Sequence, residues 1–262
     1  MDNHPIGVFD SGVGGTSIWK EINALLPHED TIYLADSKNA PYGERTKEEI
    51  VQLSIKNTEF LLGKGCKLIV VACNTATTNA IDYLRTQYQV PFIGIEPAIK
   101  PAALQSKSKK VGVLATKGTL SSLLFHSTVG NLAEGIRIYE QVGTGLVPLI
   151  ESGKANSPET KALLETYLHP MVTAGIDYLV LGCTHYPYLI PLLKEILPAH
   201  VQIIDSGEAV ARQTKAILEK NELLSNSINL GTHHFITNAD VEILKGFFTD
   251  GGASLRITYQ DF

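Results

Sequence analysis

Short apolar runs alternate with amphipathic stretches along this 262-residue chain. Strands buried on both faces read as continuous apolar runs, and the helices that cover them are apolar on one face only. The alternation therefore predicts an α/β protein with mostly parallel sheets. The predicted strands are Ile6–Phe9, Thr31–Ala35, Leu68–Ala72, Phe92–Ile95, Val111–Ala115, Arg137–Gln141, Tyr178–Leu181, Val201–Ile204 and Arg256–Tyr259, with His233–Thr237 as a weaker candidate.

Four stretches between these runs have helical periodicity or helix end signals. The first places its apolar side chains on one face and stops at Pro27. The second begins with a Thr46-x-x-Glu49 capping box and runs into Gly63. The predicted helices are Thr16–Leu26, Thr46–Leu62, the stretch from Ser157-Pro158 to Thr173, and Pro187–Leu197.

Two features indicate that the chain consists of two related α/β halves. Val8-Phe-Asp-Ser-Gly12 is echoed by Ile203-Ile-Asp-Ser-Gly207, although chance could produce so short an echo. Each half also supplies one cysteine directly after an apolar run. We expect residues 1–96 and 208–262 to form one lobe and residues 97–207 the other, pseudo-symmetric with the first, with the active site in the cleft between them.

Composition and charge exclude several classes of protein. The net charge is −5, and the longest basic run is Lys107–Lys110, which argues against binding to nucleic acid or anionic membranes. Three cysteines without a CxxC pair fit a reducing cytoplasm rather than a disulfide framework. The N-terminus does not resemble a signal peptide, and the apolar runs are far shorter than the roughly 18 residues of a membrane span.

The paired cysteines carry the strongest chemical signal. Cys73 follows Leu68–Ala72, and Cys183 follows Leu179–Gly182. Ligands of α/β sheets bind at the carboxyl ends of the strands, so two thiols placed there could hold a substrate between two bases. His185, two residues after Cys183, could orient a thiol, bind substrate or transfer a proton. Inert packing is the usual fate of a lone strand cysteine, and we expect it for Cys66.

The other candidate segments are less specific. Asp10–Thr16 is a glycine-rich turn whose free N–H groups could bind an anion, but it is neither a Walker loop nor a good dinucleotide fingerprint, and an ordinary strand-to-helix turn fits it too. Asp36–Gly43 is a polar loop with a rigid Pro-Tyr-Gly turn. Glu151 by itself is typical of a solvated charge at a helix end. Cys73, Cys183 and His185 could ligate zinc, but no spacing in the sequence supports a fourth ligand.

Seven collinear segments between Gly7 and Gly207 together resemble the glutamate racemases, within the aspartate/glutamate racemase superfamily. The two segments that contain Cys73 and Cys183 are the most specific. The matching segments are Gly7–Gly15, Ala40–Gly43, Val70–Ala76, Gly94–Pro97, Val111–Thr116, Pro148–Gly153 and Leu181–Pro187. The last fifty residues contain no sharp motif.

The resemblance implies two α/β lobes and a racemase that needs no cofactor and no metal, interconverts L- and D-glutamate, and supplies D-glutamate for peptidoglycan. It also implies a cytoplasmic location and allows a homodimer. Cys73 and Cys183 would be the acid/base thiols, with Asp10 and His185 as their helpers and Glu151 as a supporting carboxylate. The residues implied to bind substrate are Asp10, Ser11, Pro41, Tyr42, Gly43, Asn74, Thr75, Thr184 and His185.

Three other functions remain open from the sequence. An aspartate racemase would use the same chemistry on a substrate one methylene shorter, and one methylene is worth only about 1–3 kcal/mol of discrimination. A thiol redox protein or a Cys/His metalloprotein would use the same cysteines differently. An amino-acid-binding module would bind without catalysis.

Overall fold

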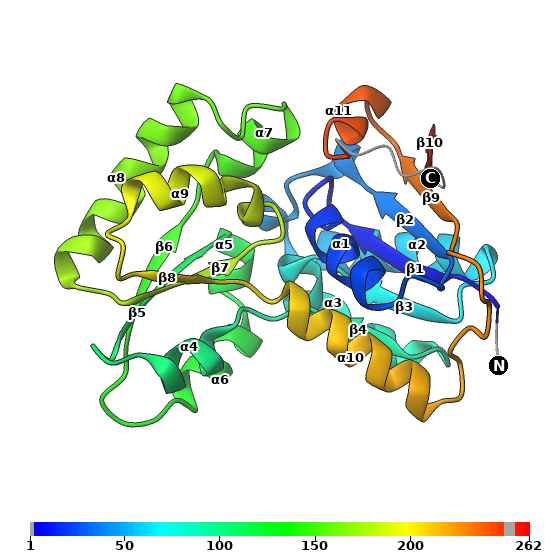
Figure 1. The fold of residues 1–262 in the computed structure, drawn as a ribbon, viewed down its shortest axis with the longest axis horizontal. Coiled ribbons are helices and arrows are strands. Elements are labelled where there is room, and N and C mark those ends of the chain that lie inside the picture. The colour runs from blue at the N-terminus through cyan, green and yellow to red at the C-terminus, as the bar shows by residue number, and fades with distance from the viewer. Residues whose placement is uncertain (1–2, 249–254) are drawn as a thin grey trace.

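Two parallel sheets form the framework of the computed structural model, which describes residues 3–248 and 255–262 (Figure 1). The larger sheet has the order β10-β9-β2-β1-β3-β4 and the smaller one the order β6-β5-β7-β8. The strands are β1 Ile6–Asp10, β2 Thr31–Ala35, β3 Leu68–Val71, β4 Phe92–Gly94, β5 Lys110–Ala115, β6 Arg137–Val142, β7 Tyr178–Gly182, β8 Gln202–Ile204, β9 His233–Thr237 and β10 Leu255–Tyr259. The predicted fold class is confirmed, and the weakest strand candidate, β9, lies inside the larger sheet between β2 and β10.

The pseudo-symmetry lies in the strand order. The order β2-β1-β3-β4 in one sheet matches β6-β5-β7-β8 in the other, so β3 and β7 are equivalent, and each is followed by one of the paired cysteines. The short sequence echo does not follow this symmetry, because it aligns the end of the central strand β1 with the end of the edge strand β8. The structural counterpart of β1 is β5.

The helices confirm three of the four predictions to within one residue at each end. Thr46 and Glu49 form the predicted capping box, and the Ser157 hydroxyl caps α8. The stretch predicted as Pro187–Leu197 is instead a 3₁₀ helix, η3, followed by α9, because Pro191 has no N–H to donate to the preceding turn. The α-helices are α1 Thr16–Leu25, α2 Lys47–Gly63, α3 Asn74–Gln87, α4 Ile99–Gln105, α5 Lys117–Leu120, α6 Leu123–Gly130, α7 Leu146–Glu151, α8 Pro158–Ala174, α9 Ile190–Ile196, α10 Gly207–Lys220 and α11 Val241–Lys245, and the 3₁₀ helices are η1 Ser37–Asn39, η2 Tyr42–Glu44 and η3 Tyr186–Leu189.

The chain passes between the two sheets at two places that lie side by side. The first passage follows β4, and the second follows β8 and leads into α10, which packs against α1 (Figure 1). The Ser206 hydroxyl donates a hydrogen bond to the Glu96 carbonyl oxygen and joins the two passages. We propose that the lobes divide at residues 96/97 and 207/208, and this juxtaposition supports the proposal.

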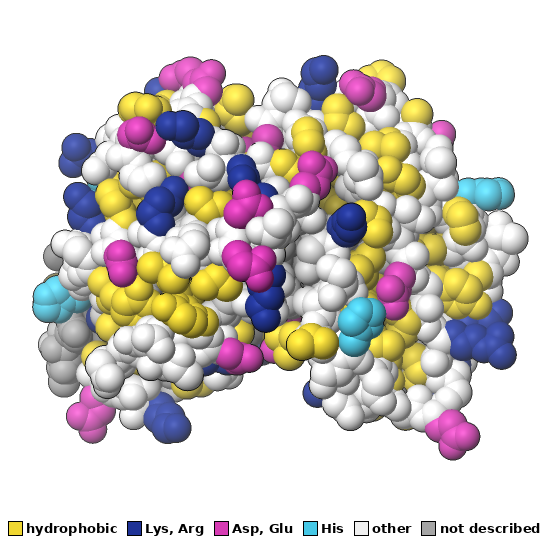
Figure 2. Space-filling view, turned by 180° about the vertical axis from the view of Figure 1, so that it is seen from behind, with side chains coloured by type: hydrophobic (Ala, Val, Ile, Leu, Met, Phe, Trp, Pro, Cys, Tyr) yellow, Lys and Arg dark blue, Asp and Glu magenta, His cyan; other side chains and the backbone are white. Residues whose placement is uncertain are grey.

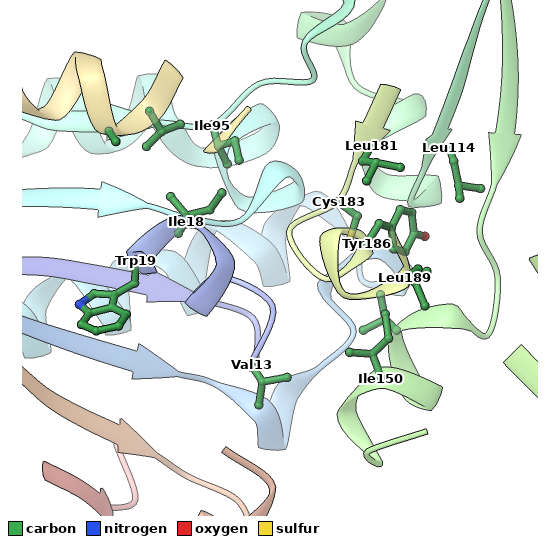
Figure 3. Close-up of a cluster of buried hydrophobic side chains, with 14 of the residues drawn as sticks. Val13, Ile18, Trp19, Ile95, Leu114, Ile150, Leu181, Cys183, Tyr186 and Leu189 are labelled. Atoms are coloured by element: carbon green, nitrogen blue, oxygen red, sulfur yellow. The ribbon is translucent and has the colours of Figure 1, made fainter. Parts of the chain in front are cut away.

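One hydrophobic cluster continues from the larger sheet into the smaller one. It includes Ile18 and Trp19 of α1, and Cys183 and Tyr186 beyond β7. In Figure 3, Val13 of the turn after β1 lies across from Ile150 of α7. Apolar contact between the two halves therefore surrounds the ends of β1 and β7.

The surface carries mixed charges. On the face in Figure 2, basic and acidic side chains of the described residues are interspersed on both sides of a central constriction. Within the described part of the chain, no helix is long and apolar enough to cross a membrane.

Candidate functional site

A nearly closed cavity lies where the carboxyl ends of β1, β3 and β7 meet. Its free volume is about 10 Å³, room for one water molecule at most. It opens beside a larger hollow of about 220 Å³ that shares Pro41, Gly43, Thr116 and Val147 with it. The residues that line the cavity are Ser11, Pro41, Tyr42, Gly43, Cys73, Asn74, Thr75, Thr116, Val147, Cys183, Thr184 and His185. The predicted residues Asp10 and Glu151 lie behind this wall.

Cys73 sits at the junction of β3 and α3. It is the N-cap of α3, and its sulfur accepts a long hydrogen bond from the Ala76 N–H at 3.5 Å. The side chain is 4% exposed. Burial raises the pKa of the Cys73 thiol, and the nearby Asp10 carboxylate raises it further, while hydrogen bonds from Ala76 and Ser11 act in the opposite direction. These surroundings favour the protonated thiol of Cys73.

Cys183 has a different partner. The Nδ1 atom of His185 lies 3.7 Å from its sulfur, and the Nε2 atom lies 2.5 Å from Glu151 Oε1. Burial lowers the pKa of His185, but the bonds to Cys183 and Glu151 outweigh it and raise the pKa well above its ordinary value. An imidazolium with both N–H groups donating fits these contacts. The Gly14 N–H, 3.3 Å from Nε2, then faces a nitrogen that cannot accept.

The pair of His185 and Glu151 predicts a pH-dependent contribution to stability. A histidine whose pKa is raised by folding stabilises the fold fully below its unfolded pKa of about 6.5 and loses that contribution as the pH rises through the folded value. We expect His185→Gln to lower the free energy of unfolding by about 1.5–3 kcal/mol at pH 6, the range of a charged hydrogen bond, and by progressively less at alkaline pH. Urea unfolding at several pH values measures this, with the exposed His169→Gln as control. A difference that grows with pH would contradict the assignment.

The glycine-rich turn after β1 binds anions, as the sequence predicts, but the anions are the chain's own carboxylates. The Gly12 and Gly15 N–H groups donate to Asp10 Oδ2, both at 3.1 Å, and the Val13 N–H donates to Glu151 Oε1 at 2.7 Å. The glycines permit this close approach. A Cβ on Gly12 would lie 1.9 Å from Glu151 Oε1, and one on Gly14 would lie 2.3 Å from His185 Nδ1.

Asp10 links the two lobes. Its second oxygen, Oδ1, accepts a hydrogen bond from the Thr184 hydroxyl at 3.0 Å. Burial raises the pKa of Asp10, although the charge of His185 and the Gly15 N–H partly offset the rise. No direct hydrogen bond joins Asp10 to Cys73 among the described residues, so any assistance to that thiol runs through electrostatics or an intervening group.

Glu151 is not the solvated charge that its local sequence suggests. The side chain is 14% exposed, and its second oxygen accepts from the Ser37 hydroxyl at 2.9 Å. Glu151 ends α7 in one lobe, whereas Ser37 and Val13 belong to the other. The Glu151 carboxylate therefore holds the segments that contain Ser37 and Val13 in place near His185.

Tyr42 lines the cavity, and its hydroxyl is held by neighbouring side chains. Its hydroxyl donates to Asp36 Oδ2 at 2.5 Å and accepts from the Asn57 amide at 3.0 Å. Asp36 is fully buried and also accepts from Asn238 and Lys56. The phenol thus anchors the Pro-Tyr-Gly loop beside the cavity.

Asn74 has unused hydrogen-bonding capacity inside the cavity. The side chain is 3% exposed, and neither its amide nitrogen nor its amide oxygen has a partner among residues 3–248 and 255–262. A buried amide without partners costs free energy, so its presence in a cavity wall indicates a polar ligand.

The sequence did not reveal a cluster of hydroxyl groups beside Asn74. Thr75 Oγ1 lies 2.8 Å from Thr116 Oγ1, and Thr116 donates to Thr119 at 3.0 Å. Thr116 follows β5, the counterpart of β1, so the pseudo-symmetry was the signal that could have found it. The three hydroxyls join α3 of one lobe to α5 of the other.

A metal site has no support in this arrangement. The described residues contain no group of three or more His, Cys, Asp or Glu side chains placed to hold a metal ion. Cys183 and His185 contact each other, and the second nitrogen of His185 is taken by Glu151.

Comparison with known proteins identifies the family to which this chain belongs. The family model for Asp/Glu/Hydantoin racemase matches residues 6–214. The chain belongs to this family. It is 47% identical over 240 residues to the glutamate racemase of Herpetosiphon aurantiacus, covering 92% of this chain and 94% of that protein. This places it among the amino-acid racemases, a class of isomerases.

Solved structures of the family have the same fold over nearly the full chain. Glutamate racemase isoform RacE1 from Bacillus anthracis superposes with a TM-score of 0.88 at 31% identity, covering 100% of this chain and 98% of that one. The Escherichia coli glutamate racemase, solved in complex with L-glutamate and an activator, gives a TM-score of 0.86 at 32% identity, covering 98% of each chain.

Proposed function

We propose that the protein interconverts L- and D-glutamate by two-base proton transfer, with Cys73 and Cys183 on opposite faces of the α-carbon. The observation that carries the proposal is the placement of two buried thiols after equivalent strands of two pseudo-symmetric sheets, both in the wall of one cavity. Relatives that are named glutamate racemases support glutamate rather than aspartate as the substrate.

Removal of the α-proton is the difficult step. A thiolate breaks the Cα–H bond, and the electron pair moves into the adjacent carboxylate. The thiol on the other face then gives its proton to the α-carbon, which inverts the centre and exchanges the thiol and thiolate states. A thiol of ordinary pKa about 8.5 is nearer neutrality than a serine hydroxyl or a lysine, and the closed cavity limits its solvation.

The two thiols have different neighbours. The His185 Nδ1 atom lies 3.7 Å from the Cys183 sulfur, whereas burial and the Asp10 carboxylate raise the pKa of the Cys73 thiol. Each enantiomer requires a thiolate on the face that carries its α-proton and a thiol on the opposite face. Binding the other enantiomer requires the opposite state, for which Asp10 and His185 supply the proton exchange.

The polar wall fits an anionic substrate. Asn74, whose amide is unpaired, can donate to the α-carboxylate and to the dianion that develops during reaction, and the hydroxyls of Thr75 and Thr184 can do so when they turn away from Thr116 and Asp10 toward the substrate. Thr116 also lies in this wall, and its hydroxyl can donate to the second carboxylate when it turns from Thr119 toward the substrate. The free space of about 10 Å³ is too small for glutamate, so the wall of the cavity must rearrange to admit it.

Each helper is proposed to serve one thiol, Asp10 for Cys73 and His185 for Cys183. We expect Asp10→Asn and His185→Asn to affect opposite directions of the chemical step. The equilibrium constant fixes the ratio of kcat/KM for the two enantiomers, so the measurement is the isotope effect with each α-deuterated enantiomer. Asp10→Asn should raise it mainly for the enantiomer deprotonated by Cys73, and His185→Asn mainly for the other. Equal changes of the isotope effect in both directions, for both variants, would contradict the assignment of one helper to each thiol.

The function itself is tested by circular dichroism on purified protein treated with a chelator and with hydroxylamine, which removes carbonyl cofactors. L-Glutamate and D-glutamate should each lose their signal until the solution is racemic, and aspartate should react far more slowly. Faster loss from aspartate would make the protein an aspartate racemase. A signal that persists with both amino acids would indicate a binding module.

The cellular role and assembly follow as further proposals. D-Glutamate made by this reaction would supply peptidoglycan synthesis in the cytoplasm. The predicted homodimer is tested by light scattering.

A further inference from the structure

Tyr188, on the 3₁₀ helix η3 that follows His185, reaches across to the other lobe. Its hydroxyl lies 2.5 Å from the hydroxyl of Thr16, the first residue of α1. The Thr16 hydroxyl donates to the Val13 carbonyl oxygen at 2.6 Å. Since that hydroxyl has one proton, Tyr188 must be the donor to Thr16. The result is a directed relay from η3 to the glycine-rich turn.

The aromatic ring of Tyr188 is also held by segments of the other lobe. Phe247, beyond α11, packs edge-on against it, with ring centroids 4.6 Å apart at 75°. The ammonium group of Lys20 in α1 lies 5.2 Å from the ring centroid. These contacts fix the position of the ring. The hydroxyl is therefore directed at Thr16 already, and little side-chain entropy is lost when the hydrogen bond to Thr16 forms.

The relay closes a ring of contacts around the proposed proton-transfer group. His185 donates to Glu151, and Glu151 accepts from the Val13 N–H. The Val13 carbonyl oxygen accepts from the Thr16 hydroxyl, which in turn accepts from the Tyr188 hydroxyl. The backbone N–H of Tyr188 donates to the His185 carbonyl oxygen at 3.2 Å. Every member therefore restrains the position of the imidazole relative to Glu151.

We propose that Tyr188 and Thr16 are positioning residues that keep the His185 imidazole aligned with Glu151 and Cys183. This inference rests on the proposed function, because it assigns His185 to the Cys183 half of the reaction. Neither residue lines the cavity, so neither contacts substrate. Substitution of either residue should therefore affect the chemical step, and only the proton transfer that involves Cys183.

The test compares Tyr188→Phe, Thr16→Val and the double variant with Tyr178→Phe. Tyr178 begins β7, the strand that leads to Cys183, and its hydroxyl contacts Gln105 of its own lobe at 3.4 Å. Each relay variant should lower kcat by about threefold to tenfold, the range of one neutral hydrogen bond, with KM nearly unchanged. The double variant should be no worse than the poorer single one, Thr16→Ser should restore activity, and Tyr178→Phe should match the wild type.

Two readouts separate positioning from general damage. The isotope effect with α-deuterated substrate should rise only for the enantiomer deprotonated by Cys183. The His185 pKa measured by NMR should fall in Tyr188→Phe, because the imidazolium is held less closely against Glu151. Additive losses, equal isotope effects in both directions, or an unchanged His185 pKa would overturn the proposal. The NMR readout needs no turnover, so it decides the matter even if the wild type fails to racemise glutamate, which would overturn the proposed function alone.

Discussion

Cys73→Ser and Cys183→Ser should each lower kcat for glutamate racemisation by about 10²–10⁴-fold, the range typical of a lost acid/base group. A serine hydroxyl fits the same space, but it is a far weaker acid and base near neutrality. The loss of kcat/KM must be equal for L- and D-glutamate, because the equilibrium constant fixes the ratio of the two values. Chiral chromatography of the two reactions measures it.

A substrate analogue that eliminates a leaving group needs only one base, and it separates the two thiols. The Cys73→Ser variant should retain elimination from one enantiomer and the Cys183→Ser variant from the other. Cys66→Ala is the matched control, because Cys66 is buried under Gly7 in the core, away from the cavity, where burial raises its pKa to about 12. Two serine variants with the same enantiomer preference would refute the assignment of one thiol to each face.

Gly14→Ala should lower kcat by about 10²-fold, the cost of displacing a reacting group by about 1 Å. The new methyl group would lie 2.3 Å from His185 Nδ1, much closer than any real contact. His185 would have to move away from both Cys183 and Glu151. The variant is assayed for racemisation and for the NMR signal of the His185 ring.

Gly63→Ala is the control for this substitution. Gly63 ends α2, and an added Cβ there meets nothing within 4 Å. It should retain wild-type activity and melt at a similar temperature. Full activity in Gly14→Ala would mean that the contact between the glycine-rich turn and His185 does not matter for the reaction.

The sequence predicted the elements whose signals are local. Buried strands such as β3 are continuous apolar runs, and the capping box of α2 is complete within four residues. Helix α3 was missed because its start is rich in threonine and asparagine, which favour helix ends and strands over helix interiors, and tertiary packing overrides that preference.

Contacts between the lobes could not be predicted from local patterns. Glu151 lies at a helix end, like many solvated charges, and only the other lobe supplies Val13 and Ser37 as its partners. Within one lobe, the hydrogen bond from the Tyr42 hydroxyl to Asp36 was not predicted either, although both residues belong to the same polar loop. To predict Thr116 as a site residue, one would have to know that β1 and β5 are equivalent strands. The short sequence echo instead matched the end of β1 with the end of β8.

The presence of two opposing bases is tested most directly by racemisation in deuterium oxide. If one thiol removes the proton and a different, solvent-exchanged thiol returns a deuteron, the first molecules of product should carry deuterium at the α-carbon. The unreacted substrate should keep its protium. NMR or mass spectrometry of the separated enantiomers at low conversion measures both. Product that retains the substrate's own protium would show that a single base serves both faces and would contradict the account.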